Sequence, residues 1–279
     1  MHIEKNIILR RKNKKPILID AFYVDKAENK PIVIFSHGYK GFKDWGAWDI
    51  MAREIANAGY CFIKFNFSHN GGTVEQPIDF PDLEAFGNNN YTKELHDLGD
   101  VIDWAIDTFS ENSSANTKEV YLIGHSRGGG ISILKSAEDN RITKLITLAS
   151  VCDFGSRSAT VGDVEQWRKD GVKYVINGRT KQKMPHYFQF YEDYQNNKEH
   201  LDIEQASKTL SIPHLIIHGD KDTSINSSEA ELIHQWSNNS KLSIIKNANH
   251  VFNVSHPWND DNLPMEFETV INKVIKFLK

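Results

Sequence analysis

The chain has few of the features that mark secreted, membrane or metal-binding proteins. Only two cysteines occur among its 279 residues, Cys61 and Cys152, and neither has a histidine at the spacing of a metal site. Each lies in or beside an apolar run, so we expect two buried free thiols rather than a disulfide. No apolar stretch reaches the roughly 20 residues that a membrane-spanning helix needs. A metal site and a membrane span are therefore not predicted.

The chain also lacks a large excess of charge of either sign. The chain carries 33 basic and 37 acidic residues, a formal net charge of −4. Its one basic cluster, from Arg10 to Lys15, reads as a hairpin turn, where solvated side chains are expected, and no nucleic-acid partner is predicted. The first residues, Met1 to Lys5, lack the apolar segment of a secretory signal. A cytoplasmic location is therefore the default expectation.

Short apolar runs alternate with longer amphipathic segments along most of the chain. This rhythm predicts an α/β fold with a mostly parallel, eight-stranded sheet and helices on both faces. The expected strands cover residues 7–10, 17–23, 32–35, 61–67, 120–123, 145–149, 214–217 and 242–245. Helices are expected at 48–56, 95–109, 131–137 and 270–277. A polar loop at 68–90 is too long to be a simple connector.

The rhythm breaks between residues 153 and 209. We interpret 1–152 together with 210–279 as the core and 153–209 as an inserted cap over the strand ends. Within the cap, Asn177-Gly178 predicts a tight hairpin turn between strands at 172–176 and 179–184. Aromatic residues then recur at helical spacing, and a homodimer that pairs through an exposed cap face is a further hypothesis.

The most informative stretch runs from Gly124 to Gly128, with the sequence G-H-S-R-G. It directly follows the apolar run 120–123 and directly precedes a helical pattern. Strand, G-x-S-x-G and helix in this order predict a nucleophile elbow, in which a strained turn exposes the hydroxyl of Ser126. A side chain at Gly124 or Gly128 would collide with the neighbouring strand or helix.

A serine hydroxyl needs a base and a group that orients that base. His250 follows the last strand and is the candidate base, and Asp222 follows the strand 214–217 and is the candidate acid. Both positions fall at strand carboxyl ends, the edge where open α/β sheets place their sites. Asp220 and Asp153 remain alternative acids, with Asp220 better suited to a local turn.

Backbone amides are the expected stabilisers of a negative oxygen. One donor is the N–H of Arg127, directly after the nucleophile, and the other is the N–H of Tyr39 in the loop after the strand 32–35. His37 is expected to brace this loop beside the substrate. Three cap aromatics, Trp167, Tyr187 and Tyr191, are candidates for the wall of the substrate pocket.

Taken together, these residues resemble the α/β-hydrolase superfamily over nearly the whole chain. The resemblance rests on His37-Gly38, the elbow, Gly219 to Asp222 and His250, in the family's order. The segment Phe65 to Gly71 and the hairpin-bearing insertion look like bacterial feruloyl and cinnamoyl esterases, and dipeptidyl-aminopeptidase-like hydrolases share the core motifs. The esterase resemblance implies a cap that shapes a pocket for an aromatic acyl group. The loop from Thr73 to Asn90 is longer than in these relatives.

The sequence therefore predicts a serine hydrolase that cleaves a small carboxylic ester without a metal or organic cofactor. An aminopeptidase or acyl-peptide hydrolase of the same fold is the alternative enzyme, with Glu192 or Asp193 as candidates to bind a substrate ammonium. The alternative of another class is a hydrolase fold that binds a partner without turnover. Loss of the serine, acid or histidine would favour that alternative, and all three are present.

Overall fold

The computed structural model describes residues 1–24, 31–112 and 115–279. Within them, one sheet has the strand order β1-β2-β4-β3-β5-β6-β9-β10. The strands are β1 (His2–Arg11), β2 (Lys14–Tyr23), β3 (Pro31–Ser36), β4 (Cys61–Asn66), β5 (Asn116–His125), β6 (Ile142–Leu148), β9 (His214–Gly219) and β10 (Ser240–Ile245). All neighbours from β4 to β10 are parallel, whereas β2 is antiparallel to both β1 and β4. The predicted fold class, a mostly parallel eight-stranded sheet, is confirmed.

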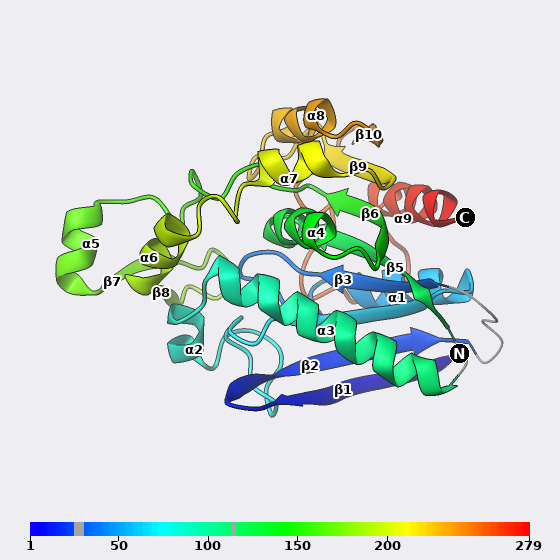
Figure 1. Cartoon of the computed structure of the whole chain (residues 1–279), viewed down its shortest axis with the longest axis horizontal. Coiled ribbons are helices and arrows are strands. Elements are labelled where there is room, and N and C mark those ends of the chain that lie inside the picture. The colour runs from blue at the N-terminus through cyan, green and yellow to red at the C-terminus, as the bar shows by residue number, and fades with distance from the viewer. Residues whose placement is uncertain (25–30, 113–114) are drawn as a thin grey trace.

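Helices cover both faces of this sheet (Figure 1). On one face lie α3 (Tyr91–Asn112), α4 (Arg127–Glu138) and α8 (Ser227–Trp236), and on the other lie α1 (Trp48–Asn57) and α9 (Met265–Leu278). Each set buries its apolar stripe on a separate core. Every residue of β3 and of β4 is buried, as expected for central parallel strands covered on both sides.

The predicted cap contains two kinds of element. α5 (Val164–Asp170), β7 (Val172–Ile176), β8 (Lys183–Tyr187) and α6 (Gln189–Asn196) project beyond the sheet at the left of Figure 1. α7 (Ile203–Thr209) instead packs against α4 and lies with the core helices. A short helix in the long polar loop, α2 (Leu83–Gly87), contacts β8 and joins the loop to the projecting part.

The hairpin of the cap differs from its prediction. Its second strand begins at Lys183, four residues after the expected position 179. The side-chain oxygen of Asn177 accepts hydrogen bonds from the N–H groups of Arg179 and Thr180, at 3.0 and 3.3 Å. These bonds favour a wider turn, and the left-handed residue is Lys181, with φ 59°. A tight turn centred on Asn177-Gly178 is therefore wrong, because the asparagine side chain competes for the turn amides.

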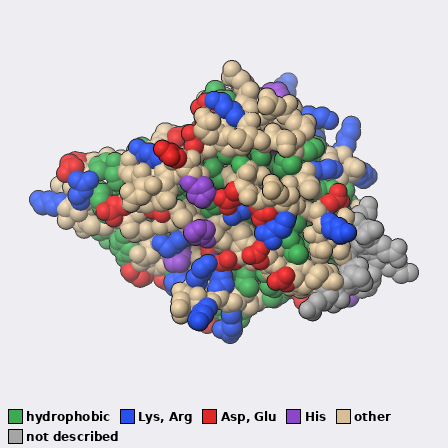
Figure 2. Space-filling model, in the orientation of Figure 1, with side chains coloured by type: hydrophobic (Ala, Val, Ile, Leu, Met, Phe, Trp, Pro, Cys, Tyr) green, Lys and Arg blue, Asp and Glu red, His purple; other side chains and the backbone are tan. Residues whose placement is uncertain are grey.

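Both cysteines are free and buried, in agreement with the sequence. Among the described residues, no helix combines the length and the apolar content needed to cross a membrane. On the face drawn in Figure 2, basic and acidic side chains are interspersed, which fits the small net charge of the chain.

Candidate active site

Ser126 stands at the sharp turn between β5 and α4. Its backbone has φ 56° and ψ −120°, a strained conformation for a residue with a side chain. A Cβ on Gly124 would lie 2.3 Å from the carbonyl oxygen of Gly128, and one on Gly128 would lie 2.4 Å from that of Ser36. Glycine at both positions lets strand and helix approach closely enough to form the predicted elbow.

His250 and Asp222 lie side by side at the same edge of the sheet. Asp222 follows β9 and His250 follows β10. The Nδ1 atom of His250 is 2.7 Å from Oδ2 of Asp222, and the histidine side chain is 20% exposed while the aspartate side chain is fully buried. An imidazole that donates from Nδ1 keeps Nε2 as the proton acceptor.

The surroundings of Asp222 favour its ionised form. Oδ1 accepts hydrogen bonds from the N–H groups of Ser224 and Ile225, at 2.8 and 2.9 Å. Burial alone would raise the pKa of Asp222, but hydrogen bonds from His218 and His250 outweigh it and hold that pKa well below its usual range. A lasting negative charge beside His250 stabilises the imidazolium form.

The alternative acids have local roles. Asp220 accepts a hydrogen bond from the N–H of Asn247 at 2.6 Å, and this bond ties together the loops after β9 and β10. Asp153 accepts from the N–H groups of Gly155 and Ser156, both at 2.7 Å. The structure therefore brings Asp222, rather than either alternative, into contact with His250.

The loop after β3 lies against the nucleophile. A Cβ on Gly38 would approach the Cβ of Ser126 to 2.8 Å, so glycine permits this contact. Tyr39 comes next in this loop. The amide of Arg127 belongs to the first turn of α4, where N–H groups have no intrahelical acceptor. Both amides chosen from the sequence thus belong to segments that adjoin Ser126.

Two buried histidines position these segments. Nδ1 of His37 lies 2.9 Å from the oxygen of Gly38, and its Nε2 accepts from the N–H of Phe67 at 3.3 Å. Nε2 of His125 lies 2.9 Å from the carbonyl oxygen of His250. Burial lowers the pKa of His37 to about 4 and that of His125 to about 3. Both are neutral near pH 7 and act as braces.

Two pockets, each of about 420 Å³, open beside Ser126. They share walls formed by Tyr39, Lys40, Ser126, Ser224 and His250. We call them the inner pocket, which reaches Phe154 and Arg157, and the outer pocket, which reaches Trp45, Trp48 and Arg179. His37 also lines the outer pocket.

The three cap aromatics chosen from the sequence lie elsewhere. The indole N–H of Trp167 donates to the carbonyl oxygen of His186 at 2.8 Å, and the hydroxyl of Tyr187 donates to Glu84. Tyr191 stacks on the ring of Phe188 at 5.6 Å. None of the three lines either pocket; they build the packing of the cap itself.

Sequence reasoning missed several residues of the pocket walls. Lys40 directly follows the predicted oxyanion residue Tyr39, and this adjacency was a signal that could have found it. Trp45 comes from the same connection between β3 and α1, and Trp48 is the first residue of α1. Phe154 and Arg157 stand where the cap begins, and no pattern in the sequence marks them.

The side chain of Arg127 joins the projecting cap to the core. Its guanidinium lies 4.3 Å from the ring centroid of Tyr39, 5.0 Å from that of Tyr91 and 5.5 Å from that of Phe190 in α6. It also forms an ion pair with Glu94 at 3.2 Å. Stacked cation–aromatic contacts of this kind hold a buried guanidinium in place.

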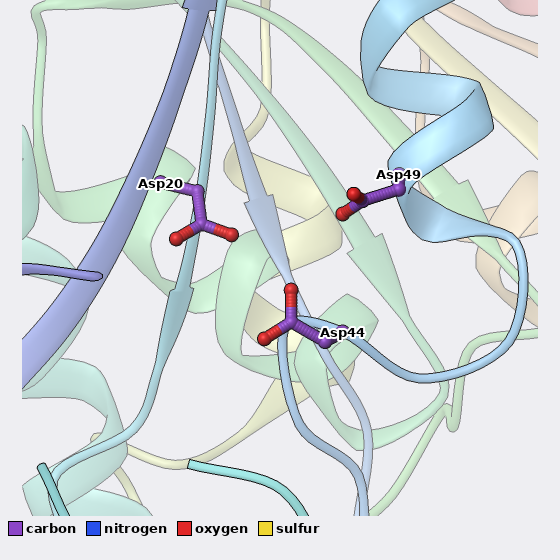
Figure 3. A group of neighbouring side chains, drawn as sticks. All are labelled: Asp20, Asp44 and Asp49. Atoms are coloured by element: carbon purple, nitrogen blue, oxygen red, sulfur yellow. The ribbon is translucent and has the colours of Figure 1, made fainter. Parts of the chain in front are cut away.

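One acidic cluster has the composition of a metal site. Oxygen atoms of Asp20, Asp44 and Asp49 lie within 4.8 Å of one another. Figure 3 shows these carboxylates, from β2, from the loop after β3 and from the start of α1, pointing toward a common space. Oxygen ligands in such a group suit a divalent cation.

Ammonium groups occupy that space instead. Lys64 lies 3.0 Å from Asp20 and 2.5 Å from both Asp44 and Asp49, and Lys43 lies 2.8 Å from Asp20 and 2.6 Å from Asp44. Lys5 forms a further ion pair with Asp49. Three carboxylates thus meet three ammonium groups, and we interpret this closed cluster as structural rather than metal-binding.

Comparison with known proteins agrees with the fold. No protein-family model and no curated relative matches the sequence. Est1E from Butyrivibrio proteoclasticus, solved with bound ferulic acid, is 18% identical with a TM-score of 0.70, over 98% of this chain and 97% of that one. The α/β hydrolase GrgF from Penicillium sp. sh18 is 16% identical with a TM-score of 0.73, over 100% and 98%. Mouse α/β hydrolase domain-containing protein 10 is 15% identical with a TM-score of 0.71, over 98% and 97%. The chain has the α/β-hydrolase fold.

Proposed function

We propose that this protein is a serine hydrolase that cleaves a carboxylic ester through an acyl-enzyme intermediate. One observation carries the proposal. Ser126, in a strained elbow, shares the walls of two pockets with His250, and Nδ1 of His250 lies 2.7 Å from Asp222. A nucleophile, a base and an orienting acid at one sheet edge are the parts that acyl transfer requires.

The steps follow from this arrangement. The hydroxyl oxygen of Ser126 attacks the ester carbonyl while Nε2 of His250 takes the hydroxyl proton. The amides of Tyr39 and Arg127 stabilise the oxyanion, a contribution of about 3–4 kcal/mol for one such donor. The imidazolium then protonates the leaving alcohol. Water, activated by His250, releases the acid in the second half of the reaction.

An aromatic acyl group of the feruloyl or cinnamoyl type suits the pocket walls. Tyr39 and Phe154 line the inner pocket, and Trp45 and Trp48 line the outer one. Aromatic rings of substrate and protein bury large apolar areas when they pack in this way. The similarity to Est1E, whose structure holds ferulic acid, supports the same choice.

A peptidase that grips a substrate ammonium is the weaker alternative. Among the described residues that line the two pockets there is no aspartate or glutamate. Asp193 accepts a hydrogen bond from the hydroxyl of Thr92 at 3.0 Å, and Glu192 is an exposed residue of α6. Neither carboxylate is placed to bind a free amino group in these pockets.

Labelling with a fluorophosphonate probe tests the proposal. We expect the wild-type protein to be labelled at Ser126 and Ser126→Ala to be unlabelled. Ser158→Ala changes another serine of the inner pocket wall and should keep the label. Hydrolysis of phenyl and 4-nitrophenyl esters, measured in parallel, should disappear with Ser126→Ala. A folded wild-type protein that neither reacts nor hydrolyses any ester would favour a binding module instead.

A further inference from the structure

Basic side chains line both pockets beside Ser126. Lys40 belongs to both walls, Arg127 and Arg157 to the inner pocket and Arg179 to the outer pocket. No carboxylate stands among the described lining residues. A pocket wall whose charged side chains are cationic attracts anions and repels ammonium groups.

Three of these four cations already have acidic partners. Arg127 pairs with Glu94 at 3.2 Å, Arg157 with Glu229 at 3.0 Å, and Arg179 with Asp79. Lys40 differs from them. Within the described part of the chain its ammonium has no ion pair or hydrogen bond. The ammonium lies over the ring of Tyr39, 5.0 Å from the ring centroid.

The backbone at Lys40 is also unusual. The N–H of Gly41 donates to the carbonyl oxygen of Gly38 at 3.0 Å and closes a turn in which Lys40 has φ 55°. Glycine or asparagine is the usual residue at such a left-handed position, and another residue costs roughly 1–2 kcal/mol there. A strained residue at the rim of a reaction site is an indication of function.

The charge of Lys40 is costly where it lies. The side chain is half-buried, and burial together with the nearby charge of Arg127 lowers the pKa of Lys40. An anion bound beside the ammonium would offset both effects. Since one cation of the wall lacks a partner, a single negative charge is the complement.

We propose that the ester substrate carries a carboxylate and that the ammonium of Lys40 binds it. That the bound anion is a substrate rests on the proposed ester hydrolysis. The anion site itself is inferred from three other observations: the cationic pocket walls, the absence of an acidic partner for Lys40, and the left-handed turn at Lys40. Lys40 is then a specificity-determining residue that touches the substrate away from the scissile bond.

Binding to the Ser126→Ala protein tests the inference without turnover. The probes are phenyl hydrogen glutarate, with the carboxylate on the acyl side, 4-carboxyphenyl pentanoate, with it on the alcohol side, and the neutral phenyl pentanoate. Isothermal titration at low salt should give at least one carboxylate ester a Kd about tenfold below that of the neutral ester, as a charge-assisted hydrogen bond provides. Which probe gains shows which side of the substrate meets Lys40.

Variants of Lys40 assign the effect to its ammonium. In the same background, Lys40→Met should reduce the affinity ratio to about one, and Lys40→Arg should keep most of it. Lys40→Gly removes the charge and fits φ 55° without strain, so it remains informative if the methionine variant folds poorly. The matched control is Lys181→Met, a lysine with φ 59° outside both pocket walls, which should leave the ratio unchanged.

Two results would overturn the inference. Carboxylate esters that bind no more tightly than phenyl pentanoate would remove the anion site, and so would a ratio that persists in Lys40→Met and Lys40→Gly. Neither result would contradict ester hydrolysis by the wild-type protein, because probe labelling and turnover measure that activity separately.

Discussion

Two lysines on one loop, three residues apart, have opposite surroundings. Lys43 is buried in the closed cluster, with Asp20 at 2.8 Å and Asp44 at 2.6 Å. Lys40 lines the pockets beside Ser126 and has no acidic partner among the described residues. The loop between β3 and α1 therefore carries one lysine whose charge is satisfied within the fold and one whose charge is left for a ligand.

The difference indicates how the loop divides its work. The closed cluster links β2, β4, α1 and the loop, and it fixes the path of the chain below the turn at Gly38. With that base held, the turn itself can keep a left-handed lysine and an amide beside Ser126. Substitutions in the closed cluster should therefore change the stability of the fold. Substitutions among the residues that line the two pockets or contact His250, which we call the pocket side, should change turnover and selectivity.

The largest effect is expected on the pocket side, at the acid. Asp222→Asn should lower kcat by about four orders of magnitude, because the imidazole of His250 loses its orienting charge. Asp220→Asn is the matched control, since Asp220 bonds the amide of Asn247, and should change kcat by less than about threefold. Steady-state kinetics on phenyl pentanoate measures both, and the reverse pattern would reassign the acid.

In the closed cluster the main effect should be on folding. Lys43→Met leaves the buried carboxylate of Asp20 without one of its two ammonium partners and is expected to cost about 3–5 kcal/mol of unfolding free energy. Lys40→Met removes an unpaired charge and should change stability by at most about 1 kcal/mol. Urea titration of the two variants compares them directly. Equal losses would mean that Lys40 has a structural partner after all.

The sequence predicts the parts of this molecule that local pattern determines. Continuous apolar runs such as 32–35 predict buried parallel strands, and G-x-S-x-G between a strand and a helix predicts the turn at Ser126. The nearness of Asp222 and His250 also follows, because parallel strands end at one edge of the sheet.

Features that depend on tertiary contacts could not be predicted in the same way. Lys40 has a left-handed backbone in a turn that begins at Gly38, where the chain lies against Ser126, and Arg157 reaches the inner pocket from an irregular loop. The helical spacing of Tyr187 and Tyr191 fits both a pocket wall and cap packing, and only coordinates separate the two. At Asn177 the side chain, rather than the Asn-Gly pair, decides the turn.

A smaller effect is expected in the pH dependence of the closed cluster. Burial alone would raise the pKa of Asp44, but the charges of Lys64 and Lys43 hold it well below its usual range. The unfolded chain, with an ordinary aspartate pKa of about 3.9, binds the proton first as the pH falls. The stability from Asp44 is therefore complete above about pH 5 and is lost toward lower pH. Urea unfolding from pH 6 to pH 3 should show a shallower decline for Asp44→Asn; an identical decline would place the proton uptake elsewhere.

The smallest effect is expected at Tyr39, where the pocket side meets the cap. Its hydroxyl lies 2.7 Å from Nε2 of His186 in β8, while the proposed catalytic group is its backbone amide. Tyr39→Phe should therefore cost about 1 kcal/mol of stability through the lost hydrogen bond and leave kcat on phenyl pentanoate within about threefold. His186→Gln, which can still accept a hydrogen bond, is the matched variant and should cost less stability.

A drop in kcat of Tyr39→Phe of more than about tenfold, or roughly 1.4 kcal/mol in barrier height, would give the phenol a direct part in the reaction. Tyr39 would then have both a structural role, through its contact with the cap, and a direct role in the reaction.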